Sequence, residues 1–416
     1  MTSNATSQDT ASGTGPGAPK IPVEIWVLVS AAFIIALGYG LIAPIIPQFA
    51  VSFDVSMAAA GAVVSIFAMS RLLFAPVSGR LIDALGSRKV YLTGLITVAV
   101  TTALVAFAQE YWHILLLRGI GGVGSTMFTV SAMGLIVKMA PPSIRGKASS
   151  VYASAFLIGN IIGPVVGAAL SMLGMRIPFV IYGGAVALAA FVVWWRMPKM
   201  DDSARSGAHT QPPLNFREAF RDSAYRSALF GAFANGWSNF GVRVATLPLF
   251  AAAVFQHGGA AAGLAMATFA AGNAVALQFS GRLADRIGRK PLIISGLIVN
   301  AVFTGGMGFA DGFWPLLIVS AIAGAGAGML NPAQQAVLAD VIGNNRSGGK
   351  VLANYQMAQD FGAITGPIIV GAVAELMGFR AGFLICGVIG LAAAAIWTFG
   401  RETLEKDDTD LERVGQ

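Results

Sequence analysis

The sequence predicts an all-α polytopic membrane protein, with twelve transmembrane helices arranged as two pseudo-symmetric six-helix bundles. Three observations lead to this fold class. The chain of 416 residues is 56% hydrophobic and 11% charged, whereas soluble domains average about 45–50% apolar and about 25% charged residues. Twelve apolar stretches are each long enough to cross a bilayer, which takes roughly 20 residues in a helix. Two separate motifs also recur at nearly the same offset along the chain.

The predicted spans follow one another from residue 22 to residue 400. Their centres lie at Ala36, Phe67, Val100, Met127, Ile161, Ala187, Ser238, Ala271, Val299, Gly324, Ala363 and Gly390. The first stretch, residues 22–50, is too long for a signal peptide and has no cleavage site after it, so we expect it to be retained.

Polar segments divide the chain into five parts. We expect residues 1–21 to form a disordered cytoplasmic tail, because Ser, Thr, Gly, Ala and Pro provide too little apolar surface for a core. Residues 197–224 are the only long polar segment inside the chain and form the predicted linker. The N-terminal six-helix bundle then covers residues 22–196, the C-terminal bundle covers 225–400, and residues 401–416 form a cytoplasmic tail.

The distribution of basic residues predicts the orientation. With both termini cytoplasmic, 22 of the 27 Lys and Arg residues lie in cytoplasmic segments, two lie outside and three lie within spans. Basic residues concentrate on the cytoplasmic side of membrane proteins. We therefore expect a multi-pass plasma-membrane protein whose net charge of +7 faces anionic lipid rather than nucleic acid.

Two motif pairs predict an internal repeat. The string GRLADRIGRK (281–290) resembles GRLIDALGSRK (79–89), which starts 202 positions earlier, and Gly163-Pro164 precedes Gly366-Pro367 by 203 positions. Both copies of the charged string fall at the cytoplasmic end of a predicted span. Their glycines allow tight turns and close helix contact, and Asp285 can accept hydrogen bonds from a helix N-terminus. The nearly equal offsets indicate a duplicated six-helix unit.

At this point the chain resembles the major facilitator superfamily over about residues 22–400. The family's loop signature is matched in full by the second copy, at Gly281, Asp285, Arg286, Gly288, Arg289 and Lys290. The first copy keeps Gly79, Asp83, Gly86 and Arg88 but departs from the signature at Ala84 and Ser87. The resemblance implies the major facilitator fold and a conformational function for these loops.

Three further motifs narrow the resemblance to the twelve-span drug:proton antiporters. They are GYGLIAPIIP (38–47) in the first span, RGIGGVG (118–124) in the fourth, and GNIIGPVVG (159–167) in the fifth. The resemblance implies export of small amphipathic compounds by alternating access, coupled to proton influx, and gating by Gly163, Pro164 and Gly167. Gly-Pro also occurs in ordinary kinked membrane helices, so this motif alone does not establish export.

Ionisable residues inside the bilayer indicate functional sites. The spans contain Arg71, Arg118 and Arg243, and Asp360 is the only carboxylate that lies well inside. We expect Asp360 to respond to protons, with a nearby arginine stabilising its charged form. The predicted substrate and translocation residues are Arg71, Arg118, Asn235, Asn239, Arg243 and Asn331. Three Arg against one Asp favour neutral or anionic amphipaths.

Several alternatives remain open at this stage. Neutral side chains such as Asn235, Gln278 and Gln334 suit a transporter of sugars or other polar metabolites, in either direction. A membrane-embedded enzyme or a non-transporting receptor is less well supported, because the spans contain no catalytic cluster and the second loop signature is intact. GNNRSGGKV (343–351) is only a near match to a phosphate-binding loop. We expect no cofactor and no metal, and a monomer.

Overall fold

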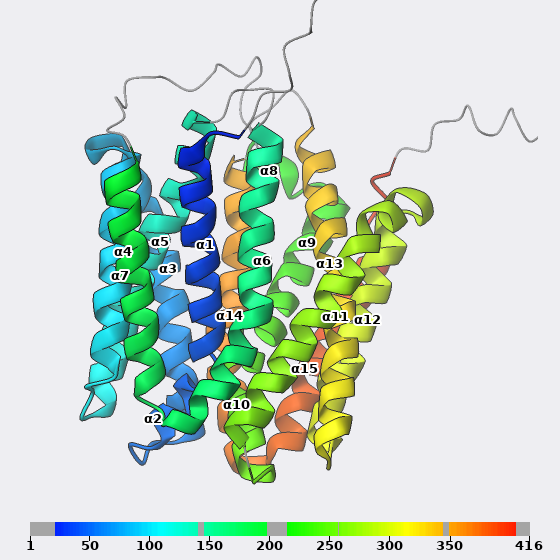
Figure 1. Cartoon of the computed structure of the whole chain (residues 1–416). Coiled ribbons are helices and arrows are strands. Elements are labelled where there is room, and N and C mark those ends of the chain that lie inside the picture. The colour runs from blue at the N-terminus through cyan, green and yellow to red at the C-terminus, as the bar shows by residue number, and fades with distance from the viewer. Residues whose placement is uncertain (1–20, 140–144, 198–213, 257, 344–348, 405–416) are drawn as a thin grey trace, which may run out of the picture.

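The computed structural model describes residues 21–139, 145–197, 214–256, 258–343 and 349–404, and this part of the chain is almost entirely helical. Long helices run side by side through the molecule (Figure 1). The helices before residue 200 are α1 (Val23–Ile42), α2 (Ile46–Val51), α3 (Met57–Leu85), α4 (Ser87–Val105), α5 (Tyr111–Met139), α6 (Arg145–Leu170) and α7 (Ile177–Arg196). Those that follow are α8 (Phe216–Ala219), α9 (Ser223–Asn235), α10 (Arg243–Val254), α11 (Gly258–Ile287), α12 (Arg289–Gly306), α13 (Phe313–Ile342), α14 (Gly349–Met377) and α15 (Phe379–Thr398).

Ten helices in the described part are long and apolar enough to cross a membrane. The fifth and seventh predicted stretches differ from this set. Within α6 the apolar stretch is the shorter segment Ser154–Leu170. The seventh stretch is not one α-helix, because α9 passes into the π-helical segment η3 (Gly236–Val242) before α10 begins. Single π turns inside helices are frequent at functional sites.

Helix α1 begins and α15 ends at the same end of the molecule, which we call the terminal face, and we call the opposite end the far face (Figure 1). The packing of the early helices recurs later in the chain. Helix α4 packs against α5 and α7, and in the same way α12 packs against α13 and α15; α3 packs against α5 as α11 packs against α13. This recurrence is what a duplicated unit requires.

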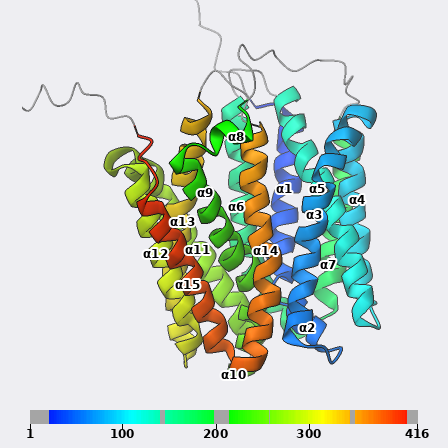
Figure 2. The same cartoon turned by 180° about the vertical axis from the view of Figure 1, so that it is seen from behind.

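The most extensive contacts between the early and the later helices are those of α3 with α14, which Figure 2 displays side by side, and of α6 with α11. Close contacts in both pairs lie in the half nearer the far face. Ser65 of α3 donates a hydrogen bond to the carbonyl of Ile364 at 2.7 Å. A Cβ atom added to Gly263 of α11 would lie 2.7 Å from the Cβ of Ala168 of α6.

Single glycines join the helices at both signature loops. Gly86, between α3 and α4, has a φ of 86°, and Gly288, between α11 and α12, has a φ of 102°. Backbone with positive φ is accessible to glycine at little cost, so both predicted tight turns are confirmed. The expected close helix contact of Gly281 is wrong in this conformation, because a Cβ atom there would meet nothing within 4 Å; the same holds for Gly79.

The near match to a phosphate-binding loop lies partly outside the described residues. Helix α13 ends at Ile342, directly before it, and α14 begins at Gly349. A phosphate-binding loop follows a β-strand, so the local structure does not suit that motif.

Candidate functional site

Arg118 is buried in α5, with 6% of its surface exposed. It lies seven residues from the start of α5 at the far face, a rise of roughly 10 Å. The guanidinium carbon lies 4.1 Å from the centre of the Phe67 ring, and Nε has no hydrogen-bond partner among the described residues. Stacking on an aromatic face partly compensates a buried cation for lost water.

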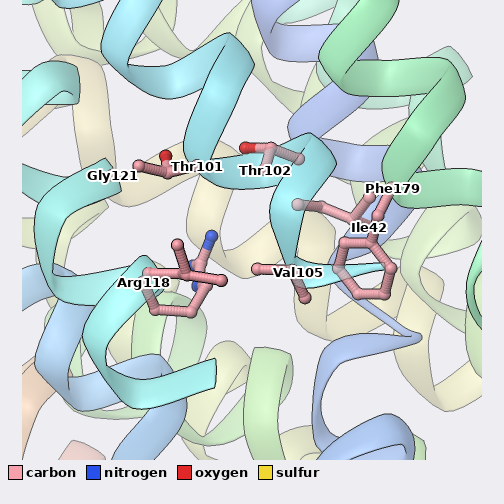
Figure 3. A pocket seen from close by; sticks show the side chains of 8 residues that line it. Ile42, Thr101, Thr102, Val105, Arg118, Gly121 and Phe179 are labelled. Atoms are coloured by element: carbon pink, nitrogen blue, oxygen red, sulfur yellow. The ribbon is translucent and has the colours of Figure 1, made fainter. Parts of the chain in front are cut away.

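Figure 3 shows the side chains that line a small cavity next to Arg118. It is lined by Arg118, Leu117 and Gly121 of α5, Thr101, Thr102 and Val105 of α4, Ile42 of α1 and Phe179 of α7. Its volume is about 10 Å³, which is close to the least space that one water molecule needs. Arg118 therefore lines a cavity that is too small for a drug-sized substrate.

Arg243, at the start of α10, is also buried, with 4% of its surface exposed. Its Nη2 donates to Thr304 Oγ1 at 3.1 Å and to Asn239 Oδ1 at 3.4 Å, and its guanidinium carbon lies 3.6 Å from the centre of the Phe269 ring. No carboxylate among the described residues forms an ion pair with it. Arg243 is thus a buried cation with neutral partners.

Asn239, which binds Arg243, is the first of three hydrogen-bonded asparagine side chains. Its Nδ2 donates to Asn235 Oδ1 at 2.8 Å, and Asn235 Nδ2 donates to Asn331 Oδ1 of α13 at 3.1 Å. Asn300 of α12 also donates to Asn239 Oδ1, at 3.2 Å. We call Arg243, Asn239, Asn235 and Asn331 the amide chain. The structure brings together four of the six predicted translocation residues; Asn300 and Thr304, which join them, were missed because neither lies near a motif.

Arg71 and Asp360 lie on the two helices of the α3–α14 pair, both partly exposed. Asp360 interacts electrostatically with Arg71 and accepts a hydrogen bond from Gln356 Nε2 at 2.9 Å. Arg71 is therefore the arginine that was predicted to lie near Asp360. Arg71 lies fourteen residues from either end of α3, at the middle of its length.

The three arginines thus lie in three different surroundings. Arg118 contacts α3 through Phe67, Arg243 contacts α11 and α12, and Arg71 faces α14. Arg118 lies much nearer the far face than Arg71 does.

The basic residues of both signature loops bind the ends of neighbouring helices. Arg88 Nη2 donates to the carbonyl of Trp194 near the end of α7 at 2.7 Å, and Lys290 Nζ donates to that of Thr398 at the end of α15 at 2.6 Å. Arg289 forms an ion pair with Asp340 and donates to the carbonyl of Ala336, both in α13. Cations at helix C-termini are stabilised by the unpaired carbonyls there.

The acidic residues of the loops are arranged differently from the expectation. Asp285 is exposed and accepts no hydrogen bond from a helix N-terminus, Arg286 is exposed beside it, and the side chain of Asp83 is outside the described residues. Glu402 takes the expected place at the start of α12, accepting from the backbone N–H groups of Arg289 at 3.1 Å and Lys290 at 3.0 Å. Glu402 was missed because it lies 113 residues away in sequence.

The GNIIGPVVG motif brings α6 close to α1. A Cβ atom on Gly163 would lie 2.9 Å from the Cα of Gly40, and one on Gly167 would lie 3.0 Å from the Cα of Leu41. Pro164 also contacts Gly40. The motif therefore provides close helix packing. Among the described residues, no three His, Cys, Asp or Glu side chains gather in a way that would hold a metal ion.

Long apolar helices, a repeated pair of glycine-jointed basic loops and buried intramembrane cations define a polytopic membrane transporter. The family model of the Major Facilitator Superfamily matches residues 28–258 and 228–415. The chain belongs to this superfamily.

Curated relatives support the resemblance to drug:proton antiporters. The chain is 25% identical over 381 residues to Multidrug resistance protein 2 of Bacillus subtilis (strain 168), covering 89% of this chain and 94% of the relative. It is 26% identical over 406 residues to Multidrug resistance protein MdtG of Enterobacter lignolyticus (strain SCF1), covering 92% and 95%. Among solved structures, a bacterial homolog of the human lysosomal transporter Spinster, in an inward-facing and unoccupied conformation, matches with a TM-score of 0.76 at 19% identity, covering 90% of this chain and 95% of that chain.

Proposed function

We propose that the protein is a secondary active transporter that exports small amphipathic compounds by alternating access, coupled to proton influx. The observation that carries the proposal is the placement of Asp360 and Arg71 on opposite helices of the α3–α14 pair. The multidrug resistance proteins to which the chain is similar support export as the direction of transport.

The proposed architecture is twelve spans in two six-helix bundles, residues 22–196 and 225–400, joined by the linker 197–224. Helix α6 supplies the fifth span, and α9, η3 and α10 together supply the seventh. Recurrent packing of α3–α5 and α11–α13 supports this division. The terminal face is then cytoplasmic, in agreement with the basic residues that it carries, and the protein acts as a monomer in the plasma membrane.

Alternating access requires the bundles to separate at one face while they close at the other. Ser65–Ile364 and Ala168–Gly263 are close contacts between the bundles, and both lie in the half nearer the far face. The described conformation is then closed towards the outside and open towards the cytoplasm. Asp285, exposed in this conformation, and Gly281, which has free space around it, would make their contacts when the cytoplasmic side closes.

Proton coupling follows from the charge of Asp360. While Asp360 is ionised, its attraction to Arg71 favours the conformation in which α3 and α14 stay together. Protonation removes that attraction, and a pair of partly buried charges contributes enough to shift a two-state equilibrium. A proton bound at Asp360 therefore changes the balance between the two conformations.

A transporter of sugars or other polar metabolites is the second candidate. The amide chain favours it, because Asn235, Asn239 and Asn331 offer neutral donors and acceptors that match hydroxyl groups. A transport screen in an efflux-deficient host, with amphipathic drugs and with sugars, separates the two candidates.

The decisive variant is Asp360→Asn, measured in proteoliposomes. We expect it to lose accumulation driven by a pH gradient while it still exchanges substrate down a concentration gradient. Glu375→Gln is the matched control, because Glu375 is an exposed carboxylate on the same helix near the far face; it should behave like the wild type. Protonophore-sensitive accumulation by Asp360→Asn at the wild-type rate would contradict the proposal.

A further inference from the structure

The amide chain has a direction. Arg243 can only donate, so its Nη2 must meet the oxygen of Asn239. Asn300 Nδ2 is fixed as a donor by the carbonyl of Ala323, at 2.8 Å, and donates to the same Asn239 oxygen. The other end of the Asn239 amide is therefore its NH₂ group, which donates to Asn235.

The orientations of Asn235 and Asn331 follow in the same way. Asn235 accepts through Oδ1 and must donate through Nδ2, which it does to Asn331 Oδ1 at 3.1 Å. The free end of the chain is then the NH₂ group of Asn331. In the described part of the chain, no hydrogen bond from Asn331 Nδ2 to another residue is formed. Asn331 is only partly buried, whereas Asn235 and Arg243 behind it are 3% and 4% exposed.

The charge of Arg243 polarises this row of amides. Hydrogen bonds that run head to tail strengthen one another, and the effect grows where water is excluded. In Asn239 and Asn235 the amide oxygen lies on the side of the guanidinium and the NH₂ group on the side of Asn331. No described carboxylate pairs with Arg243, so the positive charge is not cancelled within the site, and an uncompensated buried charge is costly.

We propose that the amide chain is an anion-recognition site, in which Asn331 Nδ2 donates to the carboxylate or sulfonate of an amphipathic substrate and Arg243 supplies the positive potential. This proposal rests on the proposed transport function and names the substrate class for it. An anion is preferred over a neutral acceptor because only the anion compensates the buried guanidinium, and hydrogen bonds to charged groups are stronger than neutral ones.

The test measures equilibrium binding by the full-length protein in lipid nanodiscs, using three dansyl probes that differ in charge. These are dansylglycine (anionic), dansylamide (neutral) and N-(2-aminoethyl)dansylamide (cationic). We expect the wild type to bind dansylglycine roughly tenfold more tightly than dansylamide. Arg243→Gln should bring the two dissociation constants together without weakening dansylamide binding.

Asn331→Asp is the sharper variant. Its carboxylate can still accept the hydrogen bond from Asn235, but it replaces the free donor by an acceptor, so the preference should reverse towards the cationic probe. Asn160→Asp is the matched control: Asn160 is also partly buried, and among the described residues its side chain bonds to the carbonyl of Phe156 in its own helix. This control should keep the wild-type preference.

Equal binding of dansylglycine and dansylamide by the wild type would overturn the proposal, as would a preference for the anion that survives Asn331→Asp. Thermal melting identifies a variant that fails to fold. If Arg243→Gln fails to fold, the binding preference of Asn331→Asp still tests the anion site. The two proposals fail separately. Anion preference in binding without protonophore-sensitive transport of any probe would reject only the transport function. Protonophore-sensitive export of dansylamide without anion preference would reject only the anion site.

Discussion

Two carboxylates at the terminal face, Glu402 and Asp222, each hold a helix N-terminus. Burial alone would raise the pKa of Glu402, but backbone hydrogen bonds from Leu404, Lys290, Arg289 and Thr403 together lower it below its ordinary value. Asp222 caps α9 through the N–H of Ala224 and pairs with Arg401, with Nη2 to Oδ2 at 2.7 Å. Its pKa is likewise lowered: burial acts against the shift, and the hydrogen bonds from Arg401 and Ala224 outweigh it. Residues 401–402 thus join the end of α15 to the starts of both α9 and α12.

The lowered pKa of Glu402 predicts a pH dependence of stability. A carboxyl group whose pKa is lower in the folded state stabilises the protein above its unfolded-state pKa, and this contribution is lost as the pH falls through the folded-state pKa. A negative charge at a helix N-terminus contributes about 0.3–1 kcal/mol to the free energy of unfolding. We therefore expect Glu402→Gln to lose this contribution near neutral pH and to melt at a lower temperature than the wild type. The difference from the wild type should vanish in acid. Melting curves between pH 3 and pH 7 test this, and a constant difference across that range would contradict it.

At the scale of elements, glycines and one π turn decide how the helices meet. Gly236 and Gly362 let η3 and α14 approach closely: a Cβ atom on Gly362 would lie 2.7 Å from the backbone nitrogen of Trp237. Segment η3 therefore packs against α14, the helix that carries Asp360, while the Asn239 side chain bonds to Asn300 of α12. Gly288 differs, because its positive φ requires glycine, and an added Cβ atom would also displace the carboxylate of Glu402 beside it.

The two glycines of the second signature loop should respond differently to substitution. Gly288→Ala should lower stability by about 1–2 kcal/mol, because alanine at positive φ is strained. Gly281→Ala should leave the melting temperature unchanged or raise it, because the added methyl group meets nothing within 4 Å and alanine favours the helix. Thermal melting of both purified variants tests the prediction. Equal destabilisation by the two variants would show that the loop has another structure.

At the scale of the whole molecule, the contacts between α6 and α11 near the far face define one closed side. In the Gly263→Cys/Ala168→Cys variant, made in a Cys386→Ala background, the new side chains would start from Cβ atoms about 2.7 Å apart. Disulfides need Cβ atoms about 3.5–4.5 Å apart, so α6 and α11 must move slightly apart for the bond to form. Oxidation should lock the far side closed and abolish transport, and reduction should restore it. Unchanged transport by the fully oxidised protein would contradict alternating access at this interface.

The orientation of the whole molecule is tested by labelling single cysteines. Cys386 is fully buried, so Cys386→Ala provides the background. Arg221→Cys lies at the terminal face and Ser52→Cys at the opposite face, and both positions are exposed. In intact cells, an impermeant thiol reagent should label position 52 and leave position 221 unlabelled. Position 210 in the linker, which lies outside the described residues, should also stay unlabelled. The reverse pattern would place the termini outside.

Much of the fold followed from the sequence because its causes are local. Apolar length predicts spanning helices, and the glycines of the two loops predict tight turns that Gly86 and Gly288 form. The repeated motifs predicted the family, which the family match confirms. The interruption of the seventh stretch at η3 could not be predicted, because one additional residue in a turn leaves the apolar pattern unchanged.

The site depended on tertiary structure. The sequence by itself supplied the ionisable and amide residues inside the spans, since a charge in an apolar stretch is visible without coordinates. Which of them meet was decided by packing: α14 brings Asp360 to Arg71, while α12 and α13 bring Asn300, Thr304 and Asn331 to the residues around Arg243. These contacts join residues that lie about 60 to 290 positions apart, and they depend on how whole helices pack. The spacing of residues along the sequence does not predict that packing.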